Sequence, residues 1–160
     1  MKSSTLFKSL MILFFTLSLN VVSHGQDNES IIGKWKTIDD ETGKEKSVVE
    51  IYQKNDGKYY GKIIKLFRKE GEDPDPVCDK CDEDDARYNK KILGMEIVTA
   101  LEKNEDNEYE DGEILDPKKG KVYDCKLWIE NGKLQVRGYV LFFHRTQEWL
   151  KYTEEKAPVQ

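Results

Sequence analysis

Apolar and polar residues alternate with a period of two along much of the chain after residue 32, and no helical period of 3.6 is sustained there. Such alternation is typical of strands with one buried face. The clearest case is segment 121–129, whose predicted buried face consists of Tyr123, Cys125, Leu127 and Ile129. The pattern therefore predicts an all-β protein.

Seven segments rich in β-branched and aromatic residues are predicted to be strands. Between several of them, Asn, Asp, Gly or Pro supplies the backbone angles that a reversal needs, as in 39–43, 55–57, 116–120 and 131–132. Consecutive strands joined by short turns pair antiparallel, and a meander of this length closes as a barrel or folds into a sandwich. The predicted strands are 33–39, 47–53, 58–67, 92–101, 121–129, 134–143 and 145–152.

The N-terminus has the features of a secretory signal peptide. Lys2 and Lys8 precede an apolar stretch at 10–22, which ends at the small residues Ser23 and Gly25 around a predicted cleavage site. We therefore expect a signal peptide at 1–25, a flexible segment at 26–32, one barrel domain at 33–152 and a flexible tail at 153–160. The mature protein is expected to be secreted or periplasmic, with no membrane span.

Composition narrows the classes of partner. Removing residues 1–25 takes away two lysines and no acid, so the formal charge moves from −5 to −7. An acidic chain without a dense basic stretch disfavours binding to nucleic acid and to anionic lipid surfaces. The three Trp, eight Tyr and six Phe are enough to build a core despite 36% charged residues.

Segment 68–91 interrupts the meander with a long loop insert that contains Cys78 and Cys81. In an exported protein these cysteines favour a disulfide that staples the loop. The alternatives are a bridge to Cys125, a metal site completed by Cys125 and His144, and a redox-active dithiol. Cys125 lies on an apolar strand face, where a buried thiol is the usual state.

The same insert carries seven acidic residues between 73 and 85. Clustered carboxylates can bind Ca²⁺, but this stretch lacks the Gly and the terminal Glu of an EF-hand loop. We expect these acids to form a solvated surface, and neither a metal nor a cofactor is predicted. The acids are Asp73, Asp75, Asp79, Asp82, Glu83, Asp84 and Asp85.

The residues after the leader offer few candidates for nucleophilic catalysis. His144 is the only histidine there, and Ser30 and Ser47 are the only serines, neither of them on a strand-to-helix turn. Pairs of carboxylates are abundant, but none stands in an apolar setting that would raise its pKa. An enzyme is not expected.

The barrel interior is the remaining candidate site. Small barrels are either filled by side chains or hold one small ligand. Aromatic and cationic residues of the predicted strands could line such a cup, whereas in a filled barrel Arg137 would point to water. The candidates are Tyr60, Arg137, Tyr139, Arg145 and Trp149.

An ordered set of short motifs resembles the secreted bacterial family known as domain of unknown function 2147 (DUF2147), over essentially all of the mature chain. The resemblance implies a lipocalin-like or streptavidin-like up-and-down barrel of about eight strands in the bacterial envelope. It assigns no activity and no catalytic residue. The motifs are Gly33-x-Trp35 with Asp39, Lys58-x-x-Gly61-Lys62-Ile63, Pro76-x-Cys78-x-x-Cys81, Leu93-Gly94-Met95, Ile114-Leu115-Asp116-Pro117, Tyr123, Arg137-Gly138-Tyr139 and Arg145-Thr146-Gln147-x-Trp149.

In lipocalin-like barrels an Arg of the last strand lies over an early Trp and closes the barrel floor. By this likeness we expect Gly33, Trp35, Arg145 and Trp149 to form the closure, because closing a barrel brings the last strand beside the first. The expected function is non-catalytic binding of a small apolar or anionic ligand. The alternatives are an envelope protein-interaction module with a filled barrel and, third, an enzyme of unknown class.

Overall fold

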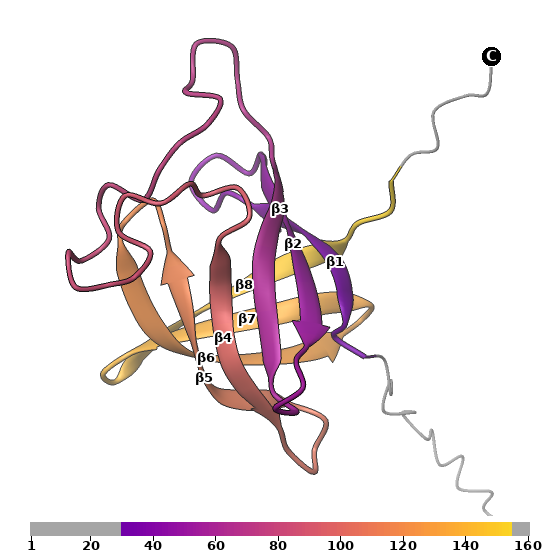
Figure 1. Cartoon of the computed structure of the whole chain (residues 1–160). Coiled ribbons are helices and arrows are strands. Elements are labelled where there is room, and N and C mark those ends of the chain that lie inside the picture. The colour runs from indigo at the N-terminus through magenta and orange to yellow at the C-terminus, as the bar shows by residue number, and fades with distance from the viewer. Residues whose placement is uncertain (1–29, 155–160) are drawn as a thin grey trace, which may run out of the picture.

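The computed structural model describes residues 30–154 and shows eight strands that form one closed antiparallel barrel (Figure 1). Each strand pairs with its neighbours in sequence, and the last strand pairs with the first. The predicted all-β, up-and-down barrel is therefore confirmed. The strands are β1 (Gly33–Ile38), β2 (Glu45–Gln53), β3 (Tyr59–Leu66), β4 (Glu96–Lys103), β5 (Tyr109–Asp116), β6 (Lys121–Glu130), β7 (Lys133–Val140) and β8 (Phe143–Lys151).

The predicted signal peptide at 1–25 lies outside the described residues, as does most of the segment 26–32. Ile31, within that segment, is fully buried, and its carbonyl oxygen accepts a hydrogen bond of 2.7 Å from Nε1 of Trp35. The predicted tail is described as far as Glu154, whose carboxylate pairs with Lys34 at 2.6 Å. Among residues 30–154 no helix is long and apolar enough to cross a membrane.

The two ends of the barrel differ in how they are filled. At the end near Ile31, which we call the floor, Trp35, Leu101 and Leu134 are fully buried, and the rings of Tyr59 and Tyr109 meet edge to face at 4.7 Å. The opposite end, which we call the mouth, carries the β1–β2, β3–β4, β5–β6 and β7–β8 connections. In Figure 1 the long β3–β4 loop projects from this end.

One strand escaped prediction, β5. Half of its residues are acidic, and Gly112 stands where an apolar residue would mark the buried face. A Cβ atom at Gly112 would lie 2.4 Å from the carbonyl oxygen of Thr99, so the close approach of β4 and β5 needs glycine there. The glycine that this packing requires interrupts the alternation of apolar and polar residues by which a strand is recognised in a sequence.

Two strand ends differ from the prediction by more than two residues. β4 begins at Glu96 rather than at residue 92, because the chain still turns at Gly94, whose φ is +85°. The reversal between β7 and β8 is a two-residue turn at Leu141 and Phe142, inside the segment predicted to be strand. Neither residue is a usual turn former, so the sequence carries no turn signal at this point.

Barrel closure uses a different cation from the one expected. Trp35 is fully buried and stands opposite Lys151, whose Nζ lies 5.3 Å from the centre of the indole ring. Arg145 lies near the other end of β8, where it pairs with Asp40 at 2.8 Å instead. Trp149 is also buried, but it stands opposite Leu134 of β7 rather than over Trp35.

Trp35→Ala should lower the free energy of unfolding by roughly 3–5 kcal/mol, because it removes a fully buried ring and leaves a cavity. Trp128 offers a matched control, since its half-buried indole lies on the outer surface under the guanidinium of Arg137. Trp128→Ala should cost only about 1 kcal/mol. Urea denaturation measures both, and equal losses for the two variants would contradict this assignment of the floor.

Candidate ligand-binding cavity

The mouth half of the barrel encloses a cavity of about 780 Å³. This volume lies within the roughly 300–1,000 Å³ typical of small-molecule sites. Alternating positions of the strands supply an apolar wall, since every second residue of a strand faces the interior. The wall residues are Ile63 of β3, Ile97 of β4, Ile114 of β5, Val136 of β7 and Trp149 of β8.

Trp149 forms part of the boundary between the cavity and the packed floor. Its ring is only 2% exposed, and its Nε1 donates a hydrogen bond of 3.3 Å to Oε1 of Gln147. Below it, Leu134 and Trp35 are fully buried. The barrel is therefore filled at the floor and hollow at the mouth, so the filled and open interiors considered from the sequence each describe one half.

Side chains hold the β1–β8 seam together at the mouth. The backbone register between these strands covers only Trp35 and Lys36, near the floor. Farther up, the carboxylate of Asp40 accepts one hydrogen bond from Gln147 and pairs with Arg145 at 2.8 Å. Asp40 thereby ties the β1–β2 loop to β8, where the strands themselves have separated.

Ion pairs also cross the mouth. β1 and β2 lie opposite β5 and β6 in the eight-stranded ring. Lys118 of the β5–β6 turn lies 3.1 Å from Glu41 and 3.8 Å from Asp39, both in the β1–β2 loop. Hydrogen bonds from the hydroxyl and the amide of Thr42 lower the pKa of Asp39. Such exposed pairs contribute about 0–1 kcal/mol each, so they can open for a ligand.

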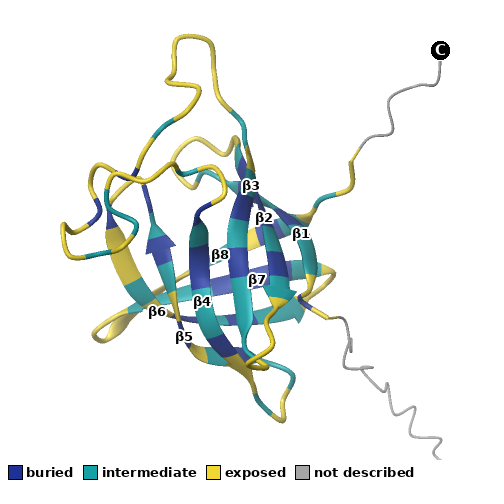
Figure 2. Ribbon diagram, viewed as in Figure 1, coloured by how far each residue is buried: buried dark blue, intermediate teal, exposed yellow. Residues whose placement is uncertain are grey.

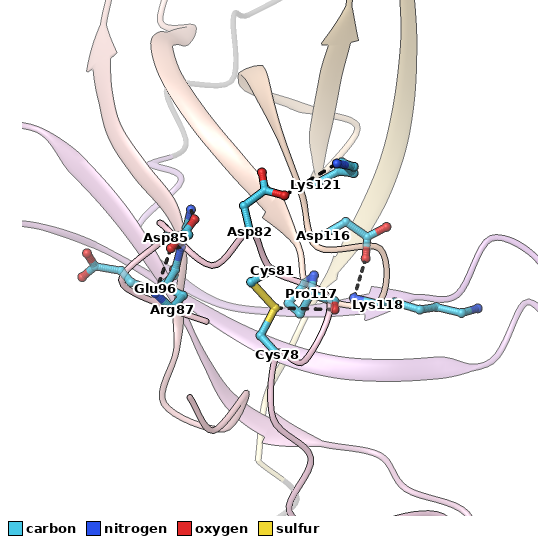
Figure 3. Close-up of a disulfide and its surroundings, with 10 residues drawn as sticks. All are labelled: Cys78, Cys81, Asp82, Asp85, Arg87, Glu96, Asp116, Pro117, Lys118 and Lys121. Atoms are coloured by element: carbon cyan, nitrogen blue, oxygen red, sulfur yellow. Dashed lines mark hydrogen bonds and ion pairs between the residues drawn. A yellow bond between two sulfur atoms is a disulfide. The ribbon is translucent and has the colours of Figure 1, made fainter. Parts of the chain in front are cut away.

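The predicted disulfide between Cys78 and Cys81 is present and lies against the β5–β6 turn (Figure 3). Both cysteines are buried, and Sγ of Cys78 is 3.7 Å from the carbonyl oxygen of Pro117. A Cβ atom at Gly120 would lie 1.7 Å from the carbonyl oxygen of Lys80. The disulfide-bonded turn and the β5–β6 turn are therefore packed backbone to backbone, which fixes the loop beside the mouth.

Three of the loop's seven acids between residues 73 and 85 pair singly with separate cations. Asp75 lies 2.5 Å from Lys91, and Asp82 lies 3.9 Å from Lys121. Arg87 pairs with Asp85 at 2.6 Å, and its hydrogen bonds to that carboxylate lower the pKa of Asp85. Among residues 30–154 no group of three or more His, Cys, Asp or Glu is placed to hold a metal ion.

Of the five residues proposed from the sequence to line the cup, the structure brings only Arg145 and Trp149 to the cavity. The other three lie on the outer surface. Tyr60 donates a hydrogen bond of 2.7 Å to Asp56, and Arg137 stacks 4.8 Å from the ring of Trp128. Tyr139 lies near His144, with ring centres 6.1 Å apart.

The reason for this difference is the parity of β7. Gly138 and Val136 face the cavity, so their neighbours Arg137 and Tyr139 face outward. The apolar wall and Asp40 were not among the predicted site residues, which were all aromatic or cationic. The alternation in β6 correctly predicted that Cys125 and Leu127 face inward. In the β6–β7 register Cys125 stands opposite Gly138 and Leu127 opposite Val136, so the same pattern could have identified both β7 residues as inward-facing.

The serines and the histidine do not form a nucleophilic pair. Ser47 is buried, and its hydroxyl shares a hydrogen bond of 2.7 Å with Thr37. His144 is exposed, with Tyr139 as its aromatic neighbour, while Ser30 is exposed near the floor. These partners differ from the Ser–His hydrogen bond that activates a hydroxyl for attack.

Thiol titration should count one buried cysteine beside the disulfide. Cys125 is a free thiol whose burial raises its pKa to about 12, so it stays protonated and shielded at pH 8. We expect no reactive thiol in the native protein, one in the unfolded protein and three after reduction, since the chain has three cysteines. Three thiols in the unreduced, unfolded protein would contradict the disulfide.

Comparisons with known proteins agree with this architecture. Residues 33–151 match the model of a family described as "Uncharacterized protein conserved in bacteria (DUF2147)". Among solved structures, the chain is similar to protein HP1028 of Helicobacter pylori, described as belonging to the lipocalin family. The TM-score is 0.65 at 19% identity, covering 78% of this chain and 84% of that one. At this identity the likeness shows the fold alone. No curated protein matches the chain.

Proposed function

The chain belongs to the DUF2147 family, and we propose that it is a non-catalytic binding barrel for a small, largely apolar ligand. The main support for this proposal is the cavity of about 780 Å³ in the mouth half of the barrel. Apolar walls with a few polar groups at the opening are the usual composition of a small-molecule site. The lipocalin-like fold is compatible with such a role.

The predicted leader and the disulfide support a location outside the cytoplasm. Disulfides persist in secreted and periplasmic proteins and are rare in reducing compartments. The Cys78–Cys81 bridge is therefore consistent with export of the chain, with residues 1–25 removed as its leader. We place the binding function in the bacterial envelope.

The rim favours a ligand with an anionic end. Arg145 lies at the opening with its side chain 60% exposed, and its acidic partner Asp40 is the group that an incoming carboxylate would displace. The apolar part of the ligand would then lie against Ile63, Val136 and Trp149 below. A fatty acid has this arrangement of groups and is the probe that we would use first.

Filling the cavity should abolish binding without disturbing the barrel. A Cβ atom at Gly138 would meet only the side chain of Tyr123, at 3.6 Å, so Gly138→Phe can project its ring into the cavity. We expect this variant to bind a fluorescent fatty acid at least about tenfold more weakly, a change of 1.4 kcal/mol.

Two control variants accompany this measurement. Gly138→Ala should bind almost as the native protein does, because one methyl group makes only ordinary contacts there. Tyr139→Phe alters the next residue, which faces outward, and should also bind normally. Equal affinity of the native protein and Gly138→Phe, with thermal unfolding confirming that both are folded, would refute the cavity as the binding site.

Arg145→Gln tests the anionic end of the ligand. It removes the cation at the rim while keeping a polar, though shorter, side chain, so affinity for a fatty acid should fall more than affinity for the matching alcohol. Charged hydrogen bonds contribute about 1.5–3 kcal/mol, which sets the expected difference at roughly tenfold or more. Fluorescence titration of both probes provides the comparison, and equal losses for acid and alcohol would exclude a role for Arg145 in recognising the charge.

A further inference from the structure

The turn between β7 and β8 carries four consecutive exposed apolar residues, which we call the apolar tip (residues 140–143). The exposed fractions are 50% for Val140, 91% for Leu141, 96% for Phe142 and 78% for Phe143. Figure 2 shows this turn as exposed at the end of its hairpin. Large apolar side chains left in water in such a row mark an interaction site.

The backbone of the apolar tip is unfavourable for the residues it contains. Leu141 has φ +53° in a two-residue hairpin turn, a conformation that favours glycine at this first position. The chain uses turn-forming residues in the equivalent connection between β6 and β7, where Asn131 and Gly132 have φ +53° and +71°. Keeping Leu141 and Phe142 at the other turn indicates a role other than reversing the chain.

Exposed apolar residues are concentrated at the mouth. Of the eight large apolar side chains exposed among residues 30–154, seven lie at this end and only Ile32 lies at the floor. Besides the apolar tip they include Val77 and Leu93 of the β3–β4 loop and Val122 at the start of β6. Val140 and Phe143 also line the cavity, so the apolar surface runs from the tip into the barrel.

We propose that the apolar tip inserts into the surface of a zwitterionic lipid bilayer and holds the mouth of the barrel against it. A ligand could then pass between the bilayer and the cavity along Phe143 and Val140 without crossing water. This second step rests on the proposed binding function, whereas insertion of the tip does not.

The size and shape of the apolar tip favour a lipid surface over a protein partner. A stable protein interface buries about 800 Å² on each partner, and an aromatic residue supplies roughly 150–250 Å². One two-residue turn with its flanking residues falls short of that area, and it is convex. A fluid bilayer interface can close around such a projection without a complementary pocket.

The charge of the chain determines the kind of lipid. With a net charge of −5, or −7 without residues 1–25, the protein gains no attraction from an anionic surface. Insertion must therefore depend on the apolar side chains, and we expect it to be largely independent of salt. This distinguishes it from the electrostatic membrane binding that the acidic sequence argues against.

Co-sedimentation with phosphatidylcholine and phosphatidylethanolamine vesicles tests the proposal. The protein should lack residues 1–25, because the apolar stretch at 10–22 would itself bind lipid, and these residues contribute none of the eight strands. We expect the native sequence to sediment with vesicles. The double variant Leu141→Gly with Phe142→Ser should bind at least about tenfold more weakly, since apolar insertion scales with buried area.

The double variant separates docking from folding. Glycine suits the positive φ of residue 141, so its melting temperature should be equal to or higher than that of the native protein. Ile32→Ser removes an exposed apolar residue at the floor and should leave vesicle binding unchanged.

Three results would overturn the proposal. They are no sedimentation of the native protein, equal sedimentation of the double variant, and binding that appears only with anionic lipid and is lost at high salt. Self-association that the double variant abolishes, without vesicle binding, would instead make the tip a protein contact and equally refute insertion.

The cavity and the tip can fail independently. Gly138→Phe should lose the fatty acid probe but still sediment with vesicles, and the double variant should keep probe affinity in solution. Vesicle binding by a native protein that binds no probe would refute the proposed binding function and leave docking intact.

Discussion

Closure of the barrel between β1 and β8 is the constraint on which the rest of the structure depends. The backbone pairing of these strands is short, covering Trp35 and Lys36 of β1. It is extended by one hydrogen bond of 2.9 Å from the amide of Tyr152 to the carbonyl of Lys34. Trp35 is one of these paired residues and is fully buried. The largest side chain of the floor therefore packs at the seam and helps to hold the two strands together. Closure pairs the first and last strands along the floor and fixes which residues face inward.

The backbone pairing of that seam lies at the floor, which is also the filled half of the barrel. Beyond Lys36 the first and last strands diverge, and the carboxylate of Asp40 spans them by binding Arg145 and Gln147. The disulfide-bonded loop packs against the β5–β6 turn on the same end of the barrel. The rim is thus held by polar contacts, and the apolar walls lie below it.

The sequence was sufficient for the architecture because alternation is a direct consequence of strand geometry. The buried face of β6, the disulfide and the one-domain meander were all readable from single segments. β5 was not, because Gly112 is required by the backbone of β4 rather than by its own strand. The turn at Leu141 was not either, since neither Leu nor Phe is a usual turn former. Tyr60, Arg137 and Tyr139 have side chains suited to ligand binding, but the alternation of their strands turns all three outward.

If the mouth half of this barrel receives an apolar ligand, as we propose, Trp149 is placed to report on it. It is the one tryptophan that lines the cavity, whereas Trp35 lies in the floor and Trp128 under Arg137 on the outside. The most direct measurement is quenching of tryptophan fluorescence by a brominated fatty acid, in the native protein and in Trp149→Phe. Saturable quenching that disappears in the variant is the predicted result. Quenching that persists unchanged, or is absent from the native protein, would contradict it.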